Sequence, residues 1–276
     1  MEGSWDRVKS GEMSPHEIQS IVSLFSTLGV KSVKITGGEP TLREDIVDIV
    51  QRISPLVDEV SMVTNGFNLE HLARKLSDAG LKRVNISLNM FNPEEWIAPS
   101  DPQSQSIIRG IIKARESGLS PIKLNMVVLK DKNSHQIPAM IEFSKRLNLI
   151  LQLIELHMPR SMTSERVFRE LYFPLKGIEE DLHTRSEKVE YAPLHRRRRF
   201  YLKGGGCVEV VRPMFNPDFC AHCYRIRVTS DGMIRPCLME DNGMVNILTP
   251  IRNHLPRKEL VELIMSAVRK RKPYWQ

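Results

Sequence analysis

The feature that most constrains the fold of this sequence is an alternation of helix-like and strand-like segments between residues 14 and 157. The helix-like segments repeat apolar residues three or four positions apart, and the strand-like segments are short runs rich in β-branched residues. The first helix is expected after Ser14, because Ser14-Pro15-His16-Glu17 has the form of a capping box. Later helices are expected to start near Arg43, Leu69, Ile107 and His135, and strands to span 30–36, 60–64, 84–88, 122–129 and 150–157.

Serial βα units predict a parallel sheet, which is either doubly wound or rolled into a barrel. One face of the expected strands is polar, with Lys34 on the first, Asn85 and Ser87 on a middle strand, and Lys123 and Asn125 on the next. A doubly wound sheet buries both faces under helices, so a repeated polar face favours a barrel that holds a polar ligand. The alternative is a solvent-exposed face of an antiparallel sheet, against which the intervening helices argue.

Length and composition set the outer limits. A chain of 276 residues with 41% apolar residues is near the upper size for one core, which allows a barrel and a small appendage. We expect a barrel region over 1–160 and a second region over 161–276, where the pattern changes. No apolar run approaches the length of a membrane span, and the N-terminus has no apolar signal segment, so a cytoplasmic location without membrane contact is expected.

The charge balance predicts an anionic partner. Lys and Arg number 40 against 33 Asp and Glu, a net charge of +7, but this does not choose between nucleotide, nucleic acid and acidic surface. Arg225 and Arg227 lie two apart on an expected strand and form a fork suited to phosphate. The run 196–199 of four arginines is interpreted as a solvated loop, and without interleaved aromatics it does not predict nucleic-acid binding.

The Gly37-Gly38-Glu39-Pro40 turn follows the first expected strand. The glycines let a ligand approach the backbone, and the Glu39 carboxylate suits an ammonium group better than a phosphate. Thr64-Asn65-Gly66 ends the second strand and is a turn in its own right, whereas Ser87 is placed to hydrogen-bond a ribose or a carboxylate.

Three of the four cysteines gather late in the chain. Cys220 and Cys223 are separated by two residues, and Cys237 returns after an expected hairpin over 227–235 with Asp231-Gly232 at its turn. This spacing predicts a metal site. Zinc, with His222 as a fourth ligand, and a [4Fe–4S] cluster with one open iron are both compatible with it. The remaining thiol, Cys207, is expected to be a small buried residue, and a last helix is expected over 256–270.

Read together, five segments resemble one family, the GTP 3′,8-cyclases, which are radical S-adenosylmethionine (SAM) enzymes of molybdenum cofactor biosynthesis. The segments are KITGGEPTLR, VTNG, VNISLN, PIKLN and FCAHCYRIRVTSDGMIRPCL. The resemblance runs from about residue 14 to residue 273. It implies an α/β fold, an incomplete parallel TIM-type (β/α) barrel whose first strand is missing here, with a small C-terminal iron–sulfur subdomain. It also favours iron–sulfur over zinc.

The resemblance implies an activity as well. Reductive cleavage of SAM gives a radical that takes a ribose hydrogen from GTP, and the sugar carbon then closes onto the guanine to give (8S)-3′,8-cyclo-7,8-dihydroguanosine 5′-triphosphate. SAM is expected to contact Gly37, Gly38, Glu39, Ser87 and His157. GTP is expected to contact Lys34, Thr64, Lys123, Arg225, Ile226 and Arg227, and the C-terminal [4Fe–4S] cluster is expected on Cys220, Cys223 and Cys237.

Three departures from the family pattern accompany the match. No cysteine precedes Cys207, so the CxxxCxxC ligands of the SAM cluster are absent; we expect a missing N-terminal segment and a chain that is inactive alone. Gln152 and His157 stand where family members carry an arginine for phosphate and a methionine against adenine. The chain ends Tyr-Trp-Gln rather than in a double glycine.

Two other functions stay open at this point: a peptide-modifying radical SAM enzyme, and a zinc-stabilised basic module that binds RNA. For the leading hypothesis, the resemblance implies GTP as substrate and a downstream cyclic pyranopterin monophosphate synthase as the consumer of the product. A homodimer is a further possibility.

Overall fold

The computed structural model describes residues 11–88 and 102–276. Its first half confirms the expected alternation. The strands are β1 (Ser32–Ile35), β2 (Glu59–Thr64), β3 (Leu81–Ser87), β4 (Ile122–Val128) and β5 (Ile150–Glu155). The helices are α1 (Pro15–Thr27), α2 (Ile46–Ile53), α3 (Leu69–Asp78), α5 (Pro102–Glu116) and α6 (Ile137–Arg146). Asn89, the last residue of the VNISLN segment, lies outside the described residues.

The capping box at the start of α1 is present. The Ser14 backbone N–H donates to the Glu17 carboxylate at 2.7 Å, and the Glu17 N–H donates to the Ser14 hydroxyl at 3.3 Å. These two bonds satisfy amide groups that the first helical turn leaves without partners. The helix therefore begins where the sequence predicts, and it ends before Gly29, whose φ of +90° suits glycine.

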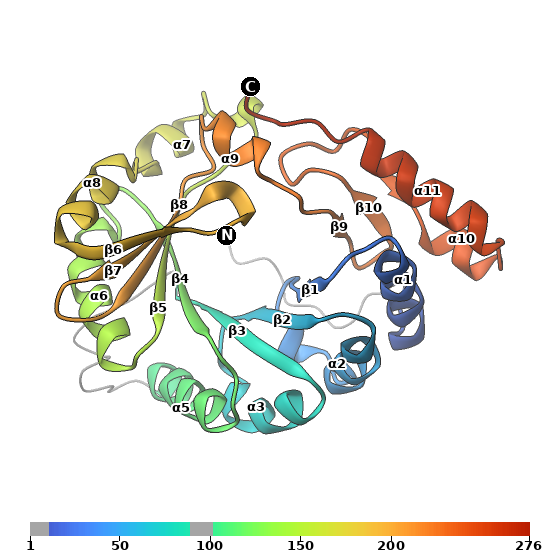
Figure 1. The fold of residues 1–276 in the computed structure, drawn as a ribbon, viewed down its shortest axis with the longest axis horizontal. Helices are drawn as coiled ribbons and strands as arrows, with labels where there is room; N and C mark the ends of the chain where they lie inside the picture. Colours follow the sequence, from blue (N-terminus) through green and yellow to red (C-terminus); the bar gives the residue numbers. More distant parts are fainter. Residues whose placement is uncertain (1–10, 89–101) are drawn as a thin grey trace.

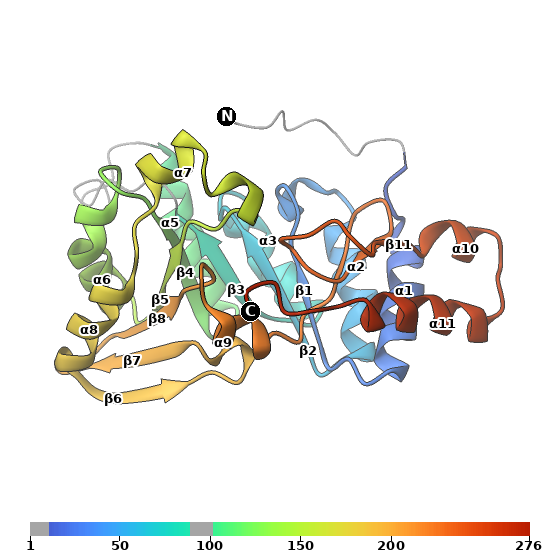
Figure 2. The same cartoon turned by 90° about the horizontal axis from the view of Figure 1, so that it is seen from above.

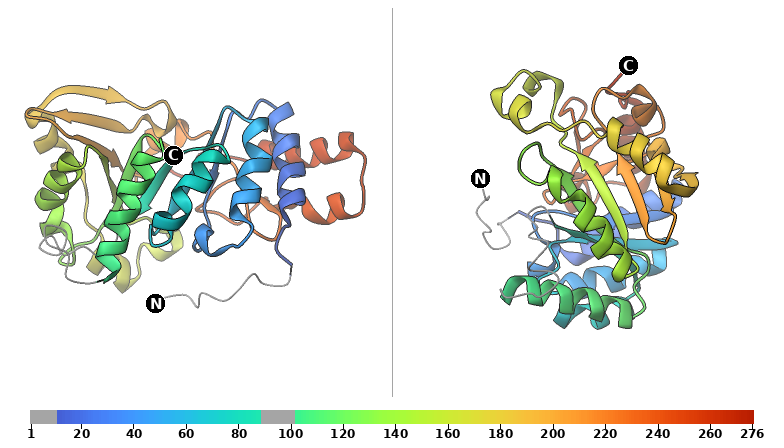
Figure 3. Two further views of the ribbon diagram at one scale, coloured as in Figure 1. Left: turned by 90° about the horizontal axis from the view of Figure 1, so that it is seen from below. Right: turned by 90° about the vertical axis from the view of Figure 1, so that its left-hand side faces the viewer.

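Eight of the described strands form one large sheet in the order β1-β2-β3-β4-β5-β8-β7-β6. Strands β1 to β5 are parallel, and β8 (Cys207–Val211) joins β5 in parallel. The last two strands, β7 (Arg198–Leu202) and β6 (Ser186–Tyr191), complete it as an antiparallel hairpin. The sheet is curved, with α2, α3, α5 and α6 on its outer side (Figure 1), and these helices stand in a row in Figure 3. This confirms the incomplete barrel.

The expected division at residue 160 stays a prediction. Strands β6, β7 and β8 all lie beyond it in the sequence, yet they extend the barrel sheet. Two more helices, α7 (Arg166–Leu171) and α8 (Lys176–Arg185), connect β5 to β6.

The C-terminal part packs against the first helix of the chain. It consists of α9 (Pro217–Ala221), a small sheet of β9 (Arg227–Val228), β10 (Met233–Arg235) and β11 (Val245–Asn246), and the helices α10 (Leu248–Arg252) and α11 (Arg257–Arg269). Ile21 and Phe25 of α1 share a buried cluster with Ile234 and Ile264 of this part. Figure 2 shows α10 and α11 beside α1. Burial of these apolar side chains holds the two ends of the chain together.

The prediction that Arg225 and Arg227 share a strand is wrong, because β9 begins at Arg227 and Arg225 precedes it. The hairpin and the last helix are confirmed. The hairpin over 227–235 forms, with Gly232 at its turn in a left-handed conformation (φ +78°), and the last helix spans Arg257–Arg269. No helix of residues 11–88 and 102–276 has the length and apolar character needed to cross a membrane.

Candidate active site

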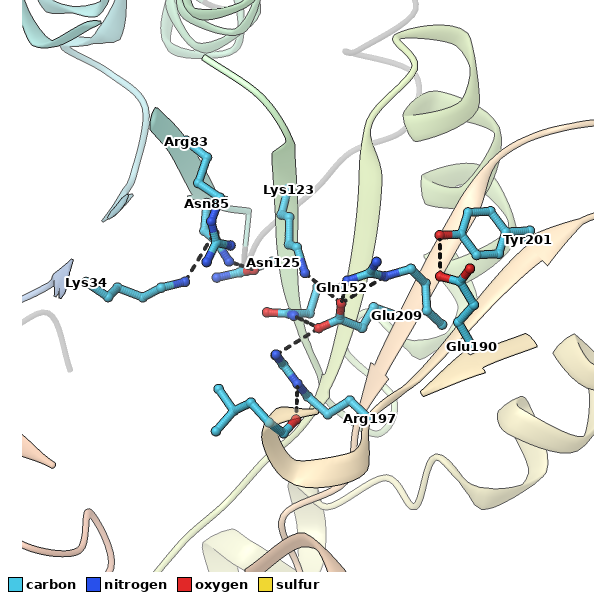
Figure 4. A network of polar contacts seen from close by, with 12 residues as sticks. Lys34, Arg83, Asn85, Lys123, Asn125, Gln152, Glu190, Arg197, Tyr201 and Glu209 are labelled. Atoms are coloured by element: carbon cyan, nitrogen blue, oxygen red, sulfur yellow. Dashed lines mark hydrogen bonds and ion pairs between the residues drawn. The ribbon is translucent and has the colours of Figure 1, made fainter. Parts of the chain in front are cut away.

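A row of polar side chains crosses the concave face of the sheet, as the strand alternation predicts. Lys34 on β1 donates from Nζ to Asn85 Oδ1 on β3 at 3.4 Å, and Asn85 Nδ2 donates to Asn125 Oδ1 on β4 at 3.2 Å (Figure 4). Asn85 and Asn125 are buried. Since buried amides keep their place only when hydrogen-bonded, this row is a fixed feature of the fold.

The row continues into a buried ionic cluster centred on Glu209 of β8. Its carboxylate forms ion pairs with Lys123 at 2.6 Å, Arg197 at 2.8 Å and Arg199 at 3.0 Å, and accepts a hydrogen bond from Gln152 at 2.5 Å. The cations hold the pKa of Glu209 at about 2, against the raising effect of burial, which is the largest single influence. One carboxylate thus faces three cations, which leaves an excess of positive charge in the site.

Further cations lie around this cluster, and within residues 11–88 and 102–276 some of them form no ion pair with a carboxylate. Burial, together with Arg83, Arg225, Lys123 and Arg197, lowers the pKa of Lys34 to about 7. Burial and neighbouring arginines likewise lower the pKa of Arg225 to about 10. No ion pair of Arg225 or Arg227 occurs in the described part of the chain. A group of half-buried, mutually repelling cations is stabilised when an anion binds among them.

The Gly37-Gly38-Glu39 turn lies at the carboxyl ends of β1 and β2. Glu39 accepts hydrogen bonds from the Thr41 amide and hydroxyl, from the Thr64 hydroxyl and from the Asn65 amide, at 2.5 to 3.0 Å. The carboxylate therefore links two loops of the protein. Gly37 and Gly38 are exposed, and Gly37 has a φ of +150° with open space where a Cβ would stand.

The other predicted contact residues lie around the same face. Thr64 is buried and its hydroxyl faces Glu39, while Ser87 ends β3 opposite Asn125 of β4. Burial, with an opposing contribution from the Glu155 backbone, lowers the pKa of His157, and Arg227 lowers it further, so His157 lies near the arginine fork. Ile226 packs against the C-terminal apolar cluster.

The three late cysteines do not converge in this structure: within the described residues, no group of three His, Cys, Asp or Glu side chains is placed to hold a metal ion. Cys223 and Cys237 both act on the pKa of Arg227, in the raising direction, against the lowering by burial. Cys220 packs against Trp275 and accepts its backbone N–H at 3.5 Å, and Cys237 accepts the Met239 N–H at 3.4 Å. Three half-buried thiols, two of which accept a backbone N–H at sulfur, fit the chemistry of an iron–sulfur site.

Among the described residues, neither His222 nor Cys207 forms a hydrogen bond with these thiols. His222 Nδ1 is 2.9 Å from the Asp218 carbonyl oxygen and 3.2 Å from the Asp218 carboxylate, so the ring faces its own helix. Cys207 begins β8 and is half-buried rather than fully buried; burial raises its pKa to about 11.

The interpretation of residues 196–199 as a solvated loop is wrong. Arg197 and Arg199 point at Glu209 and their side chains are 12% and 27% exposed, whereas Arg196 and Arg198 are 51% and 43% exposed. Arg198 and Arg199 begin β7, which pairs Arg199 directly with Glu209 of β8. Glu209 is a further residue of the site that is not among the predicted ones, although an acid flanked by valines in Val208-Glu209-Val210 is the pattern of a buried charge on a strand.

Comparison with known proteins decides the family. Residues 2–144 match the radical SAM superfamily and residues 149–276 match the Molybdenum Cofactor Synthesis C family. A probable GTP 3′,8-cyclase of Thermococcus kodakarensis is 44% identical over 269 residues, which cover 96% of this chain and 87% of the relative. One of Methanosarcina acetivorans is 42% identical over 269 residues, covering 96% and 77%.

This chain belongs to the GTP 3′,8-cyclase family. The resemblance and the radical SAM fold are confirmed, and with them the place of this family member among the radical SAM enzymes of molybdenum cofactor biosynthesis.

Solved structures support the fold of this GTP 3′,8-cyclase family member. The native anSMEcpe structure with bound AdoMet superposes with a TM-score of 0.60 at 14% identity, covering 99% of this chain and 78% of that one. SuiB of Streptococcus suis bound to the precursor peptide SuiA gives a TM-score of 0.59 at 17% identity, covering 90% and 58%. At such identities the likeness concerns the fold alone.

Proposed function

We propose that this chain binds GTP on the concave face of the barrel and serves its conversion to (8S)-3′,8-cyclo-7,8-dihydroguanosine 5′-triphosphate. The observation that carries the proposal is a set of cations with no carboxylate partner among the described residues, Lys34, Arg225 and Arg227. They lie beside a buried cluster that is itself positively charged. A triphosphate supplies the negative charge that this face lacks. The relatives named as probable GTP 3′,8-cyclases support guanosine triphosphate as its source.

The residues divide into two groups in this proposal. The phosphates would be bound by Lys34, Lys123, Arg225 and Arg227, and Thr64 and Ile226 would lie beside the nucleotide. SAM would bind at the turn of Gly37, Gly38 and Glu39, and would also contact Ser87 and His157. Because Glu39 already accepts four hydrogen bonds, its part is to hold the turn in shape for the ligand rather than to bind an ammonium alone.

Cys220, Cys223 and Cys237 would hold a C-terminal [4Fe–4S] cluster that leaves one iron without a protein ligand. In the family, SAM cleaved reductively at a second cluster supplies the hydrogen-abstracting chemistry. This sequence has no cysteine before Cys207, so its residues provide thiols for the C-terminal cluster and not for that one. The decisive experiments therefore measure binding rather than turnover.

The proposal includes two partners. A cyclic pyranopterin monophosphate synthase would consume the product, and a second copy of the chain would form a homodimer. Both follow from family membership rather than from a described surface.

Titration calorimetry with GTP and guanosine tests the nucleotide site, on the full chain after anaerobic iron reconstitution. GTP is expected to bind at least tenfold more tightly than guanosine, and Arg227→Ala to remove most of that difference. Arg235→Ala is the matched control, since Arg235 faces Arg227 across the hairpin and pairs with Asp241 at 2.6 Å. Equal binding of GTP and guanosine by the unaltered chain would rule the proposal out.

Iron analysis tests the cluster independently. Reconstitution is expected to give about four irons per chain, and Cys220→Ser, Cys223→Ser or Cys237→Ser is expected to lower this sharply. Cys207→Ser is the control and should keep the iron content, because Cys207 begins β8 in the barrel sheet, away from the late cysteine segment. A chain that takes up zinc but no iron would contradict the cluster.

A further inference from the structure

Arg197 differs from Arg196 in the direction of its side chain, because the backbone turns sharply just before it. His195 and Arg196, just before it, both have left-handed backbones, with φ of +63° and +45°. This conformation costs a non-glycine residue about 1 kcal/mol or more, so two in succession persist only where the surroundings enforce them. The turn sends Arg196 outward, to Asp218 at 3.6 Å, and Arg197 inward onto the concave face.

Two fixed contacts hold the Arg197 guanidinium. Nη1 pairs with Glu209 Oε1 at 2.8 Å, and Nε donates to the Leu194 carbonyl at 3.2 Å (Figure 4). Nη2 takes part in neither contact. A guanidinium has five N–H donors in a rigid plane, so an arginine held at Nε and at Nη1 keeps further donors for a ligand.

Arg197 lies beside a residue assigned to GTP, because Lys123 pairs with the same Glu209 carboxylate at 2.6 Å. The charge of Arg197 lowers the pKa of both Lys34 and Arg225, so it lies within electrostatic reach of residues on β1 and in the C-terminal part. Burial is the main influence that lowers its own pKa, although Glu209 opposes this. Glu209 cannot neutralise Arg197 fully, because it also serves Lys123 and Arg199.

We propose that Arg197 is a phosphate ligand of the nucleotide, held ready by Glu209 and by the Leu194 carbonyl. This inference rests on the proposed binding of GTP and adds a residue from the hairpin side of the barrel to that site. It predicts that the phosphates lie between Lys34, Arg225 and Arg197 and are gripped from both edges of the sheet.

The test compares guanosine, GMP and GTP in binding to the reconstituted full chain. Arg197→Gln is expected to weaken GTP by about tenfold to a hundredfold, the worth of one or two charged hydrogen bonds, and to leave guanosine within twofold. Arg198→Gln is the matched control: Arg198 is adjacent, but it faces Glu179 at 3.7 Å and the Tyr191 ring. Its GTP affinity should stay within twofold of the unaltered chain.

The outcomes separate the two proposals. If the unaltered chain binds GTP no better than guanosine, the proposed function fails. If it does bind GTP, and Arg197→Gln leaves GTP affinity unchanged or weakens guanosine equally, only the role of Arg197 is overturned. Removal of Arg197 leaves Glu209 with Lys123, Arg199 and Gln152, so the fold is expected to survive. Should Arg197→Gln not fold, Arg197→Met keeps most of the side-chain bulk without the charge, and a GTP affinity that it leaves unchanged would equally refute the inference.

Discussion

The carboxylate of Glu39 accepts the hydroxyl hydrogen of Thr64 at 2.7 Å, which ties the loop after β1 to the end of β2. Glu39 acts as the acceptor in all four of its hydrogen bonds, and two of the four donors are backbone amides. The turn that carries Gly37 and Gly38 therefore has its shape fixed by one side chain, before any ligand binds.

The first prediction follows from that donor set. Glu39→Gln replaces one acceptor oxygen with an NH₂ group, which then faces a donor, so we expect a loss of about 1–3 kcal/mol in the free energy of unfolding. Urea denaturation measures it. Glu44→Gln is the control, because Glu44 is exposed one turn further on. Equal stability of the two variants would show that Glu39 does not hold the loops together.

The second prediction concerns the ion pair between the two ends of the chain. Arg252 on α10 pairs with Glu17 on α1 at 2.6 Å, and this hydrogen bond is the main reason that the pKa of Glu17 falls to about 2. A depressed carboxyl pKa stabilises the fold above the unfolded pKa of about 4.5, and that stabilisation is lost as the pH falls toward 2.

Glu17→Gln is therefore expected to lower the midpoint of thermal unfolding by about 1–3 °C at pH 6.5. The difference from the unaltered chain should shrink between pH 4.5 and pH 3. Glu262→Gln, at an exposed position of α11, serves as the comparison. A difference that does not change with pH would mean that the carboxylate charge is not what matters.

Local patterns made much of this fold predictable. Helix and strand periods, the Ser14 cap and the turn glycines each depend on residues close in the sequence, and those elements were placed within a few residues. The polar row of Lys34, Asn85 and Asn125 was predictable for the same reason, since alternation along a strand decides the face.

What could not be predicted depends on contacts between distant segments. The pairing of Arg199 with Glu209 depends on the register of the antiparallel strands β7 and β8. The alternation of helices and strands along the sequence does not predict that register. The sequence predicts Glu39 as an acid at a ligand turn, but the four hydrogen bonds that it accepts come from Thr41, Thr64 and Asn65, which packing brings together. The late cysteines are likewise close together in the sequence, but that spacing does not determine the direction in which each sulfur atom points.

The third prediction concerns the hairpin between the arginine fork and Cys237. A Cβ added at Gly232 would stand 2.3 Å from the Leu248 Cβ, and its φ of +78° is strained for other residues. Gly232→Ala is expected to lower the free energy of unfolding by about 1–4 kcal/mol. Gly177→Ala in α8, which meets nothing within 4 Å, is expected to be neutral or stabilising by about 0.5–1 kcal/mol. Equal effects in chemical denaturation would contradict a special role for the turn.

The last prediction concerns the proton on Lys34. Its pKa of about 7 results from burial and from Arg83, Arg225, Lys123 and Arg197, and within residues 11–88 and 102–276 its amine donates only to the Asn85 amide oxygen. At pH 8 about nine-tenths of the free protein therefore carries a neutral Lys34. Phosphates that bind beside it favour the charged form and raise its pKa, so GTP binding should take up a proton.

Calorimetry in two buffers of different ionisation enthalpy measures that uptake. At pH 8 we expect close to one proton per GTP, because the phosphates of free GTP are already ionised and release none. Lys34→Met should abolish most of the uptake, whereas Lys31→Met, at an exposed position just before β1, should leave it intact. A binding enthalpy that is the same in both buffers would place the phosphates away from Lys34, and the electrostatic account of this face would then have to rest on the arginines alone.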